Sequence, residues 1–135
     1  MFPDQLYIAM LEDDSDDRYL TNEILTEIGF DITIRFFSNS DELLKALSLS
    51  VKPQLILVDF NSSPENGIQV LKKIKSTEHL REIPVVILSD SELPRYKKEC
   101  YAAGANSFVT KPKTITETKQ KISSFFTYWM QVAEL

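Results

Sequence analysis

The chain has 135 residues, of which 43% are hydrophobic and 26% are charged, so its composition is that of a globular domain rather than a disordered protein. Its 20 acidic and 15 basic residues give a net charge of −5, which disfavours nucleic acid and anionic membrane surfaces as partners. The single cysteine excludes an internal disulfide, and no apolar run approaches the roughly 20 residues of a membrane span. We therefore expect one cytoplasmic domain over residues 1–135.

Short apolar runs alternate along the chain with longer segments in which apolar residues recur at helical spacing. In chain order the expected elements are a strand at 6–11, a helix at 15–28, a strand at 32–37, a helix from 40 to 47, a strand at 55–58, a helix at 68–74, a strand at 85–88, a helix at 93–103, a strand at 107–110 and a helix from 114 or 116 to about 132. Ser15 is the expected N-cap of the first helix, and Gly29 is its left-handed stop. A strand–helix order repeated in this way predicts a parallel sheet with helices on both faces.

Polar side chains follow four of the expected strands at the point where each strand ends. In an open parallel sheet, ligands gather outside the carboxyl ends of the strands. The residues in these places are Glu12, Asp13 and Asp14 after the first strand, Asp59 after the third, Ser89 after the fourth and Lys111 after the fifth. The sequence therefore predicts that carboxylates, a hydroxyl and an ammonium group converge at one edge of the sheet.

Clustered carboxylates indicate a divalent cation, because they repel one another and resist ionising together without one. An acidic site made only of oxygen ligands is typical of Mg²⁺. Asp59 would act there as a nucleophile that forms an acyl phosphate, while Lys111 and Ser89 would bind the phosphoryl oxygens that the metal leaves free. Each residue alone is commonly an ordinary loop or turn residue, so the prediction depends on their combination.

Four stretches of the chain carry a family resemblance: MLEDDSDDR, LILVDFNSSPENG, PVVILSDS and AGANSFVTKP. They resemble the CheY-like receiver domain of two-component response regulators, and the resemblance covers about residues 6–131. It implies a doubly wound α/β fold, a flavodoxin-like (βα)5 arrangement whose five parallel strands lie in the order 2-1-3-4-5.

The resemblance also implies a role for each matching residue. Asp59 would be the phosphoacceptor, and Lys111 and Ser89 would contact its phosphoryl group. Mg²⁺ would be held by Glu12, Asp13, Asp59 and the backbone carbonyl of Asn61. Ser89 and Phe108 would form the switch, Asn61 and Ser91 would tune the lifetime of the phosphoryl group, and the Lys111–Pro112 bond would be cis.

Three positions depart from the family pattern. Ser63 stands four residues after Asp59, where the family usually has proline, and Pro64 follows it. Asp90 occupies a place beside Ser89 that is usually small, so its charge would repel a phosphoryl group or pair with Lys111. Phe108 lacks the hydroxyl of a tyrosine at the same position.

The resemblance implies a signalling protein and not an enzyme, apart from its own phosphotransfer and dephosphorylation. Because the chain has one histidine, His79, we expect the phosphoryl donor to be a separate histidine kinase or phosphotransfer protein of bacterial two-component signalling. With no output domain in view, we expect the signal to pass by binding a downstream protein target.

The last helix carries two apolar stripes, which is more than one buried face needs. The first stripe, Ile122, Phe126, Trp129 and Ala133, is expected to belong to the core. The second contains Phe125, Tyr128 and Val132 and is a candidate surface for a homodimer or for partner docking. This aromatic-rich helix is also similar to that of small stand-alone regulators paired with phytochrome-type kinases.

Two other functions compete with an active receiver. A degenerate receiver would keep the fold and act as a non-phosphorylated docking module, an alternative that Asp90 and the shifted Pro64 favour. A small Mg²⁺-dependent phosphohydrolase would also use Asp59 as nucleophile. That class usually has a second aspartate two residues later, where this chain has Asn61, and it needs a cap domain for which the chain is too short.

Overall fold

The computed structural model describes residues 6–29, 31–49, 51–91, 93–111 and 113–135, and within these ranges five strands alternate with five helices. The strands are β1 (Leu6–Leu11), β2 (Ile32–Phe37), β3 (Leu55–Asp59), β4 (Val85–Ser89) and β5 (Ser107–Thr110). They pair in parallel in the order β2-β1-β3-β4-β5. This arrangement confirms the expected flavodoxin-like fold.

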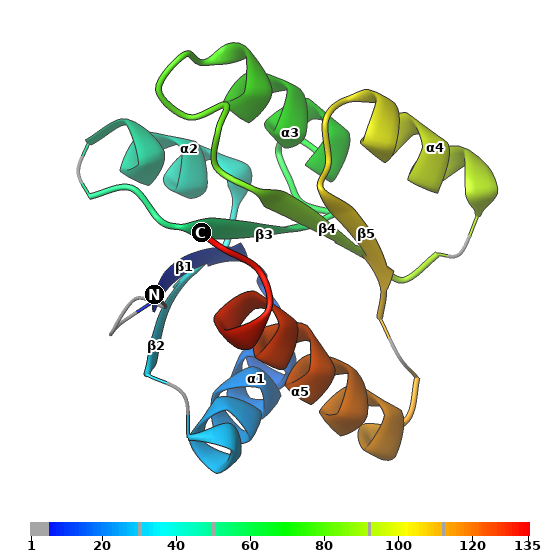
Figure 1. Ribbon diagram of the computed structural model, residues 1–135. Coiled ribbons are helices and arrows are strands. Elements are labelled where there is room, and N and C mark those ends of the chain that lie inside the picture. The colour runs from blue at the N-terminus through cyan, green and yellow to red at the C-terminus, as the bar shows by residue number, and fades with distance from the viewer. Residues whose placement is uncertain (1–5, 30, 50, 92, 112) are drawn as a thin grey trace.

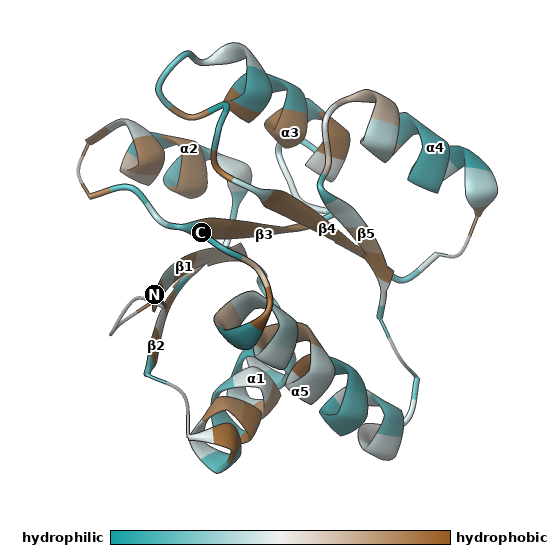
Figure 2. Ribbon diagram, viewed as in Figure 1, coloured by the Kyte–Doolittle hydropathy of each residue, from teal (hydrophilic) through white to brown (hydrophobic). Residues whose placement is uncertain are grey.

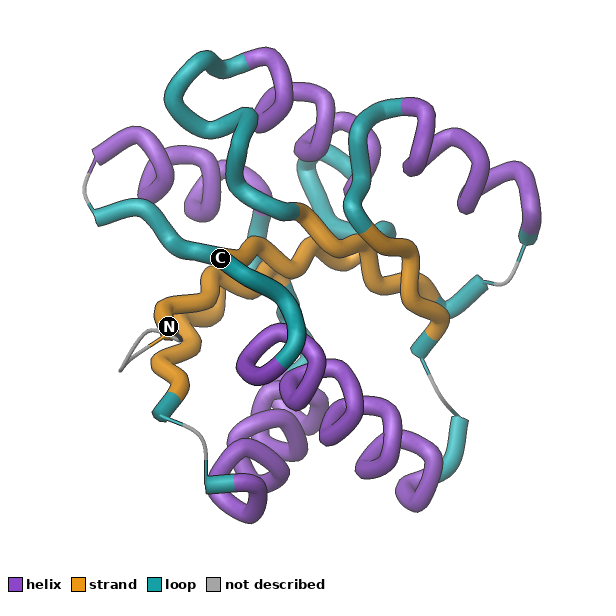
Figure 3. Tube along the Cα trace, viewed as in Figure 1, coloured by secondary structure: helices purple, strands orange, loops and turns teal. Residues whose placement is uncertain are grey.

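The helices form one layer on each side of the sheet. They are α1 (Ser15–Ile28), α2 (Ser40–Leu49), α3 (Gly67–Ser76), α4 (Pro94–Ala102) and α5 (Ile115–Gln131). Figure 1 shows α1 and α5 below the sheet and α2, α3 and α4 above it, and the tube in Figure 3 shows the strands as one layer between them. Among the described residues, no helix is both long and apolar enough to cross a membrane.

Helix caps explain where α1 begins and ends. The sequence predicted Ser15 as the N-cap, but the N-cap is Asp14. The Asp14 carboxylate accepts hydrogen bonds from the backbone N–H groups of Asp16 and Asp17, at 2.8 and 3.1 Å. A carboxylate in this place also interacts favourably with the helix dipole. At the other end, Gly29 adopts the left-handed conformation expected for it, with φ of 77°.

Two apolar cores fill the spaces between the sheet and the helix layers. We call them the α1/α5 core and the α2–α4 core, after the helices that cover them. Strand residues alternate between the two cores because successive side chains point to opposite faces. The α1/α5 core includes Leu6, Ile8, Met10, Leu55, Leu57, Val86, Phe126, Trp129 and Met130, and the α2–α4 core includes Leu11, Leu43, Ile56, Val58, Leu71, Val85, Ile87 and Cys100. In Figure 2 the strands are mostly brown, whereas much of α4 is teal.

The two apolar stripes of the last helix differ in burial, as the sequence predicted, except at Phe125. Phe126 and Trp129 of the first stripe are buried. In the second stripe, Tyr128 is 48% exposed and Val132 is 66% exposed, but Phe125 is half-buried and packs against the α1/α5 core. The exposed part of the candidate surface is therefore the end of α5.

Candidate functional site

Three carboxylates meet at the carboxyl edge of the sheet. Glu12 follows β1 directly, Asp13 comes next, and Asp59 is the last residue of β3. One oxygen of each lies within 4.8 Å of those of the other two. Glu12 is almost fully buried, with 1% of its surface exposed, while Asp13 is exposed and Asp59 is intermediate. Three of the four acidic residues expected at this edge, Glu12, Asp13 and Asp59, are therefore brought together, whereas Asp14 caps α1.

Lys111, directly after β5, places its ammonium group against two of these carboxylates. Its Nζ lies 3.2 Å from each carboxylate oxygen of Glu12 and 3.3 Å from Oδ2 of Asp59. The backbone N–H of Lys111 donates to the carbonyl of Ser89 at 2.8 Å, which continues the pairing of β5 with β4. This backbone bond holds the lysine at the edge where the acids converge.

Strand alternation explains why these side chains meet. Glu12, Asp59 and Lys111 all point toward the helix layer formed by α1 and α5, because residues two apart on a strand share a face. The residues two places earlier on the same strands pack in the α1/α5 core: Met10, Leu57 and Val109. Glu12 and Asp59 thus follow neighbouring strands at the same level, and Lys111, two residues beyond the level of Asp59, reaches them from β5.

The electrostatics of the site favour one more cation in addition to Lys111. Burial is the largest of the causes that raise the pKa of the Glu12 carboxyl to about 9; hydrogen bonds with Asp17 and Asp59 act in the same direction, and Lys111 opposes the shift. Desolvation would lower the pKa of Lys111, but the attraction of Asp59 and Glu12 outweighs it and raises that pKa above its usual value. Lys111 therefore stays charged, while Glu12 needs a further cation nearby in order to ionise.

The donor set fits a hard divalent cation. Glu12, Asp13 and Asp59 offer oxygen ligands only, at separations that one ion can bridge. Mg²⁺ and Mn²⁺ prefer carboxylate and carbonyl oxygens together with water, and the exposure of Asp13 leaves room for water ligands. The chemistry of these residues thus agrees with the metal site that the sequence predicted.

The loop after β3 is held tightly against the site. The backbone N–H of Asn61 donates to Oδ1 of Asp59 at 3.0 Å, so residue 61 lies directly beside the Asp59 carboxylate. Gly67 closes the loop by donating its N–H to the Phe60 carbonyl at 2.8 Å. A Cβ at Gly67 would lie 2.8 Å from the Cα of Phe60, so only glycine permits this approach. The Ser63–Pro64 peptide bond is cis.

The two expected switch residues lie on the opposite side of the sheet from Lys111. Ser89 is fully buried, and its hydroxyl donates to the carbonyl of Ser91 and accepts from the N–H of Ser91, both at 3.1 Å. The ring of Phe108 packs against the α2–α4 core, and its backbone N–H donates to the hydroxyl of Tyr101. The Ser89 hydroxyl is therefore held by its own loop and does not bond to Asp59.

The remaining expectations concern the surroundings of Lys111. Asp90 is exposed, and within the described ranges no ion pair joins it to Lys111. The pocket is therefore not closed by the Asp90–Lys111 pairing that the sequence left open. The expected cis bond between Lys111 and Pro112 falls outside the described residues.

Comparison with known proteins decides the family. The sequence pattern of the response regulator receiver domain matches residues 8–123 of this chain. The chain belongs to this family. Receiver domains of response regulators act with histidine kinases or phosphotransfer partners, and they bind a divalent metal.

Relatives of this receiver domain come from plants as well as from bacteria. It is 28% identical over 126 residues to the two-component response regulator ARR17 of Arabidopsis thaliana, an alignment that covers 87% of this chain and 82% of the relative. Among solved structures, it resembles the Mn²⁺-bound form of the response regulator Rcp1 with a TM-score of 0.90, at 25% identity and with 96% of this chain and 98% of the other covered. It resembles the phosphorylated cyanobacterial phytochrome response regulator RcpA equally well, with a TM-score of 0.90, 27% identity and coverage of 97% and 98%.

One residue of the receiver's site was missed by the sequence analysis. The carboxylate of Asp17, in the first turn of α1, has its Oδ2 3.6 Å from Nζ of Lys111. Its side chain is 47% exposed, so it lies at the open rim of the site. The sequence carries no local signal for this contact, because it depends on the direction in which α1 leaves β1.

A cavity of about 110 Å³ lies beneath the site, between the sheet and the helices α1 and α5. Its walls are mostly apolar and its upper end contains charged groups; the lining includes Met10, Glu12, Thr21, Leu88, Val109, Lys111, Ile122 and Phe125. Glu12, Asp17 and Lys111 all line this cavity, so it opens directly onto the charged end of the site.

Proposed function

We propose that Asp59 accepts a phosphoryl group from a histidine kinase or phosphotransfer protein in a Mg²⁺-dependent reaction, and that the phosphorylated chain signals by binding a downstream protein. The observation that carries this proposal is the contact of Asp59 Oδ2 with Nζ of Lys111 at 3.3 Å, beside the two further carboxylates of Glu12 and Asp13. A nucleophile, a fixed cation and a set of metal ligands are the parts that phosphoryl transfer needs. No other catalytic activity is proposed.

The step proceeds by attack of an Asp59 carboxylate oxygen on phosphorus. A new O–P bond forms, the P–N bond to the donor's imidazole breaks, and the imidazole leaves with the electron pair and takes up a proton. Lys111 pairs with a phosphoryl oxygen as negative charge gathers there. Glu12, Asp13, Asp59 and the carbonyl of Asn61 would hold the metal, which would supply positive charge to neutralise the phosphoryl oxygens.

The response begins with Ser89. We propose that its hydroxyl leaves its two hydrogen bonds with Ser91 in order to bond the phosphoryl group, and that Phe108 then turns toward the space that Ser89 vacates. Such a change biases a two-state element toward one of its conformations. Asn61 and Ser91 border the path of the water that hydrolyses the acyl phosphate, and they tune its lifetime.

The partner class follows from the structural likeness. Because RcpA is a phytochrome response regulator, we propose a phytochrome-type histidine kinase as the donor, with both proteins in the cytoplasm. The exposed end of α5, with Tyr128 and Val132, is the proposed contact for a second copy or a downstream target. Phe125, which is half-buried against the α1/α5 core, contributes the inner part of this surface. Replacing Tyr128 and Val132 by serine removes this association in light scattering, and an unchanged mass contradicts the contact.

The central proposal is tested by incubating the protein with acetyl phosphate and Mg²⁺. A phosphate-affinity gel and an intact mass spectrum should show one acid-stable, base-labile phosphoryl group, which is absent in Asp59→Ala and after chelation of the metal. An unmodified wild type would leave a docking module as the function. An unchanged adduct in Asp59→Ala would place the phosphoryl group elsewhere.

A further inference from the structure

Asp17 completes a ring of acids around one ammonium group. Nζ of Lys111 lies 3.2 Å from both oxygens of Glu12, 3.3 Å from Asp59 Oδ2 and 3.6 Å from Asp17 Oδ2. An ammonium group has three N–H donors, so four carboxylate oxygens already compete for them. A phosphoryl oxygen that binds Lys111 has to displace at least one of these acids.

The three acids are not equivalent competitors. The side chain of Glu12 is fully buried below Lys111, and that of Asp59 is 13% exposed. The side chain of Asp17 is 47% exposed and has the longest of the contacts. Asp17 is therefore the most exposed of the three acids that contact Lys111.

The backbone keeps Asp17 in this place. Its N–H donates to the Asp14 cap at 3.1 Å, and its carbonyl accepts from the hydroxyl of Thr21 at 2.8 Å. Asp17 is outside the group of carboxylates whose oxygens all lie within 4.8 Å, which is Glu12, Asp13 and Asp59. Asp17 is thus outside the candidate metal-ligand set, and its side chain contacts Lys111 and Glu12.

We propose that Asp17 is a positioning residue that draws the ammonium group of Lys111 toward the open rim and competes with an incoming phosphoryl group for it. This inference rests on the proposed phosphorylation of Asp59. Asp17 slows phosphoryl transfer in two ways: it occupies the cation that the donor needs, and its own charge repels the anionic donor. The first effect is exerted through Lys111 and the second through the charge of Asp17 itself; neither requires contact with Asp59 or with the transferred group.

The test compares Asp17→Asn with Asp16→Asn. Both residues lie in the first turn of α1 and carry the same charge next to the helix dipole, but Asp16 has no ion pair with Lys111 within the described ranges. With acetyl phosphate and saturating Mg²⁺, the second-order rate of phosphorylation rises about fivefold in Asp17→Asn, as expected for the loss of one like charge at short range. The rate is unchanged in Asp16→Asn, and Asp17→Glu, which retains the charge, stays close to the wild type.

Salt dependence separates this role from a structural one. The advantage of Asp17→Asn shrinks as ionic strength increases from about 0.05 M to about 0.5 M, because screening weakens the interaction of exposed charges. A structural role predicts equal losses of Tm in both asparagine variants and a rate difference that salt does not alter. A rate that falls in Asp17→Asn, or that rises equally in Asp16→Asn, overturns the proposal.

A second measurement does not depend on phosphorylation. Labelling of Lys111 by an amine-reactive succinimidyl ester, mapped by peptide mass spectrometry, becomes faster in Asp17→Asn and not in Asp16→Asn, because one acid no longer holds the ammonium group. Unchanged labelling of Lys111 overturns the role of Asp17. If the wild type takes up no phosphoryl group, the proposed function fails, and the labelling result still decides about Asp17.

Discussion

The two faces of the sheet in this receiver domain carry different groups of the proposed mechanism. The face toward α1 and α5 carries the ionisable groups Glu12, Asp59 and Lys111, which border a cavity of about 110 Å³. The face toward α2, α3 and α4 carries Ser89 and Phe108 and is packed with fully buried residues such as Val58 and Ile87. The proposed chemistry thus lies over the core that borders the cavity, and the residues proposed to respond lie in the other core.

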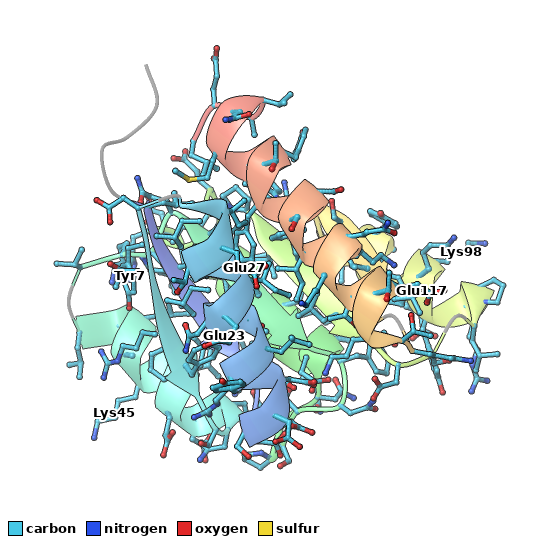
Figure 4. The ribbon with its side chains drawn as sticks, turned by 90° about the horizontal axis from the view of Figure 1, so that it is seen from below. Tyr7, Glu23, Glu27, Lys45, Lys98 and Glu117 are labelled. Carbon is cyan, nitrogen blue, oxygen red and sulfur yellow. The ribbon has the colours of Figure 1, made fainter. Side chains whose placement is uncertain are left out.

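Figure 4 shows the molecule from the side of α1 and α5. The helices α1 and α5 lie in front of the sheet, and the labelled Glu23 and Glu27 are exposed on α1. The cavity leaves Lys111 room to change partners, whereas a packed core answers a small shift with a discrete rearrangement. The contrast between the two faces is open to direct tests.

The largest effect is expected for Lys111→Met. Phosphorylation of Asp59 should fall by about 100-fold, because a fixed cation that stabilises charge in the transition state is lost. Lys113→Met removes an exposed lysine two residues away and should leave the rate unchanged. Phe108→Leu, on the opposite face, should also leave the rate near that of the wild type. A large loss in Phe108→Leu would show that the two faces do not divide chemistry from response.

The next effect concerns the loop that connects the faces. Gly67→Ala should lower the free energy of unfolding by about 2 kcal/mol, since its Cβ would lie 2.8 Å from the Cα of Phe60 and force the backbone apart. Gly29→Ala is the matched comparison, because Gly29 has a φ of 77° but no atom near the added Cβ. Only Gly67→Ala should also slow phosphorylation, since it displaces the end of β3. Equal phosphorylation in both variants would contradict the close-approach argument.

The third effect is a dependence of metal binding on pH. Because the pKa of Glu12 is raised to about 9, a cation has to displace a proton from this carboxyl at neutral pH. Mg²⁺ affinity should therefore increase with pH, by about tenfold per unit at most, between pH 6 and 8. Titration of Trp129 fluorescence measures it. Glu12→Gln should remove the slope, and a slope that persists would assign the proton to another group.

The same shift has a consequence for stability. In the metal-free protein the folded state keeps a proton on Glu12 that the unfolded chain loses near the ordinary value of 4.5. The free energy of unfolding should therefore decrease as pH rises from 4.5 toward 9, because the folded state binds more protons over this interval. Saturating Mg²⁺ should reduce the decrease. Chemical denaturation at several pH values checks both statements.

The smallest effect compares packing on the two faces. Val109→Ile adds a methylene next to the cavity and should stabilise the fold by about 0.5 kcal/mol. Val58→Ile adds the same group to the α2–α4 core, where Val58 is fully buried, and should destabilise it by about 1 kcal/mol. Thermal unfolding measures both. Equal losses of Tm would show that the two cores are packed alike.

Some features of the site were outside the reach of sequence reasoning. The position of Asp17 depends on the angle at which α1 leaves β1, which no local pattern states. The hydrogen bonds of Ser89 with Ser91 depend on the path of the β4–α4 loop, and the N-cap moved from Ser15 to Asp14 because the carboxylate reached two N–H groups. Phe125 belonged to an apolar stripe, but its half-buried place depends on the cavity beside it.

The order of the elements and the edge of the site were determined by the sequence alone. Periodicity distinguishes strands from helices, and parallel strands bring the residues that follow them to one edge, so Glu12, Asp59 and Lys111 had to lie near one another. The tertiary structure decided the distances between them, the burial of Glu12 and the pairing of Lys111 with Asp17. Those depend on how side chains from separate segments share space and charge, and such interactions appear only when the whole chain is packed.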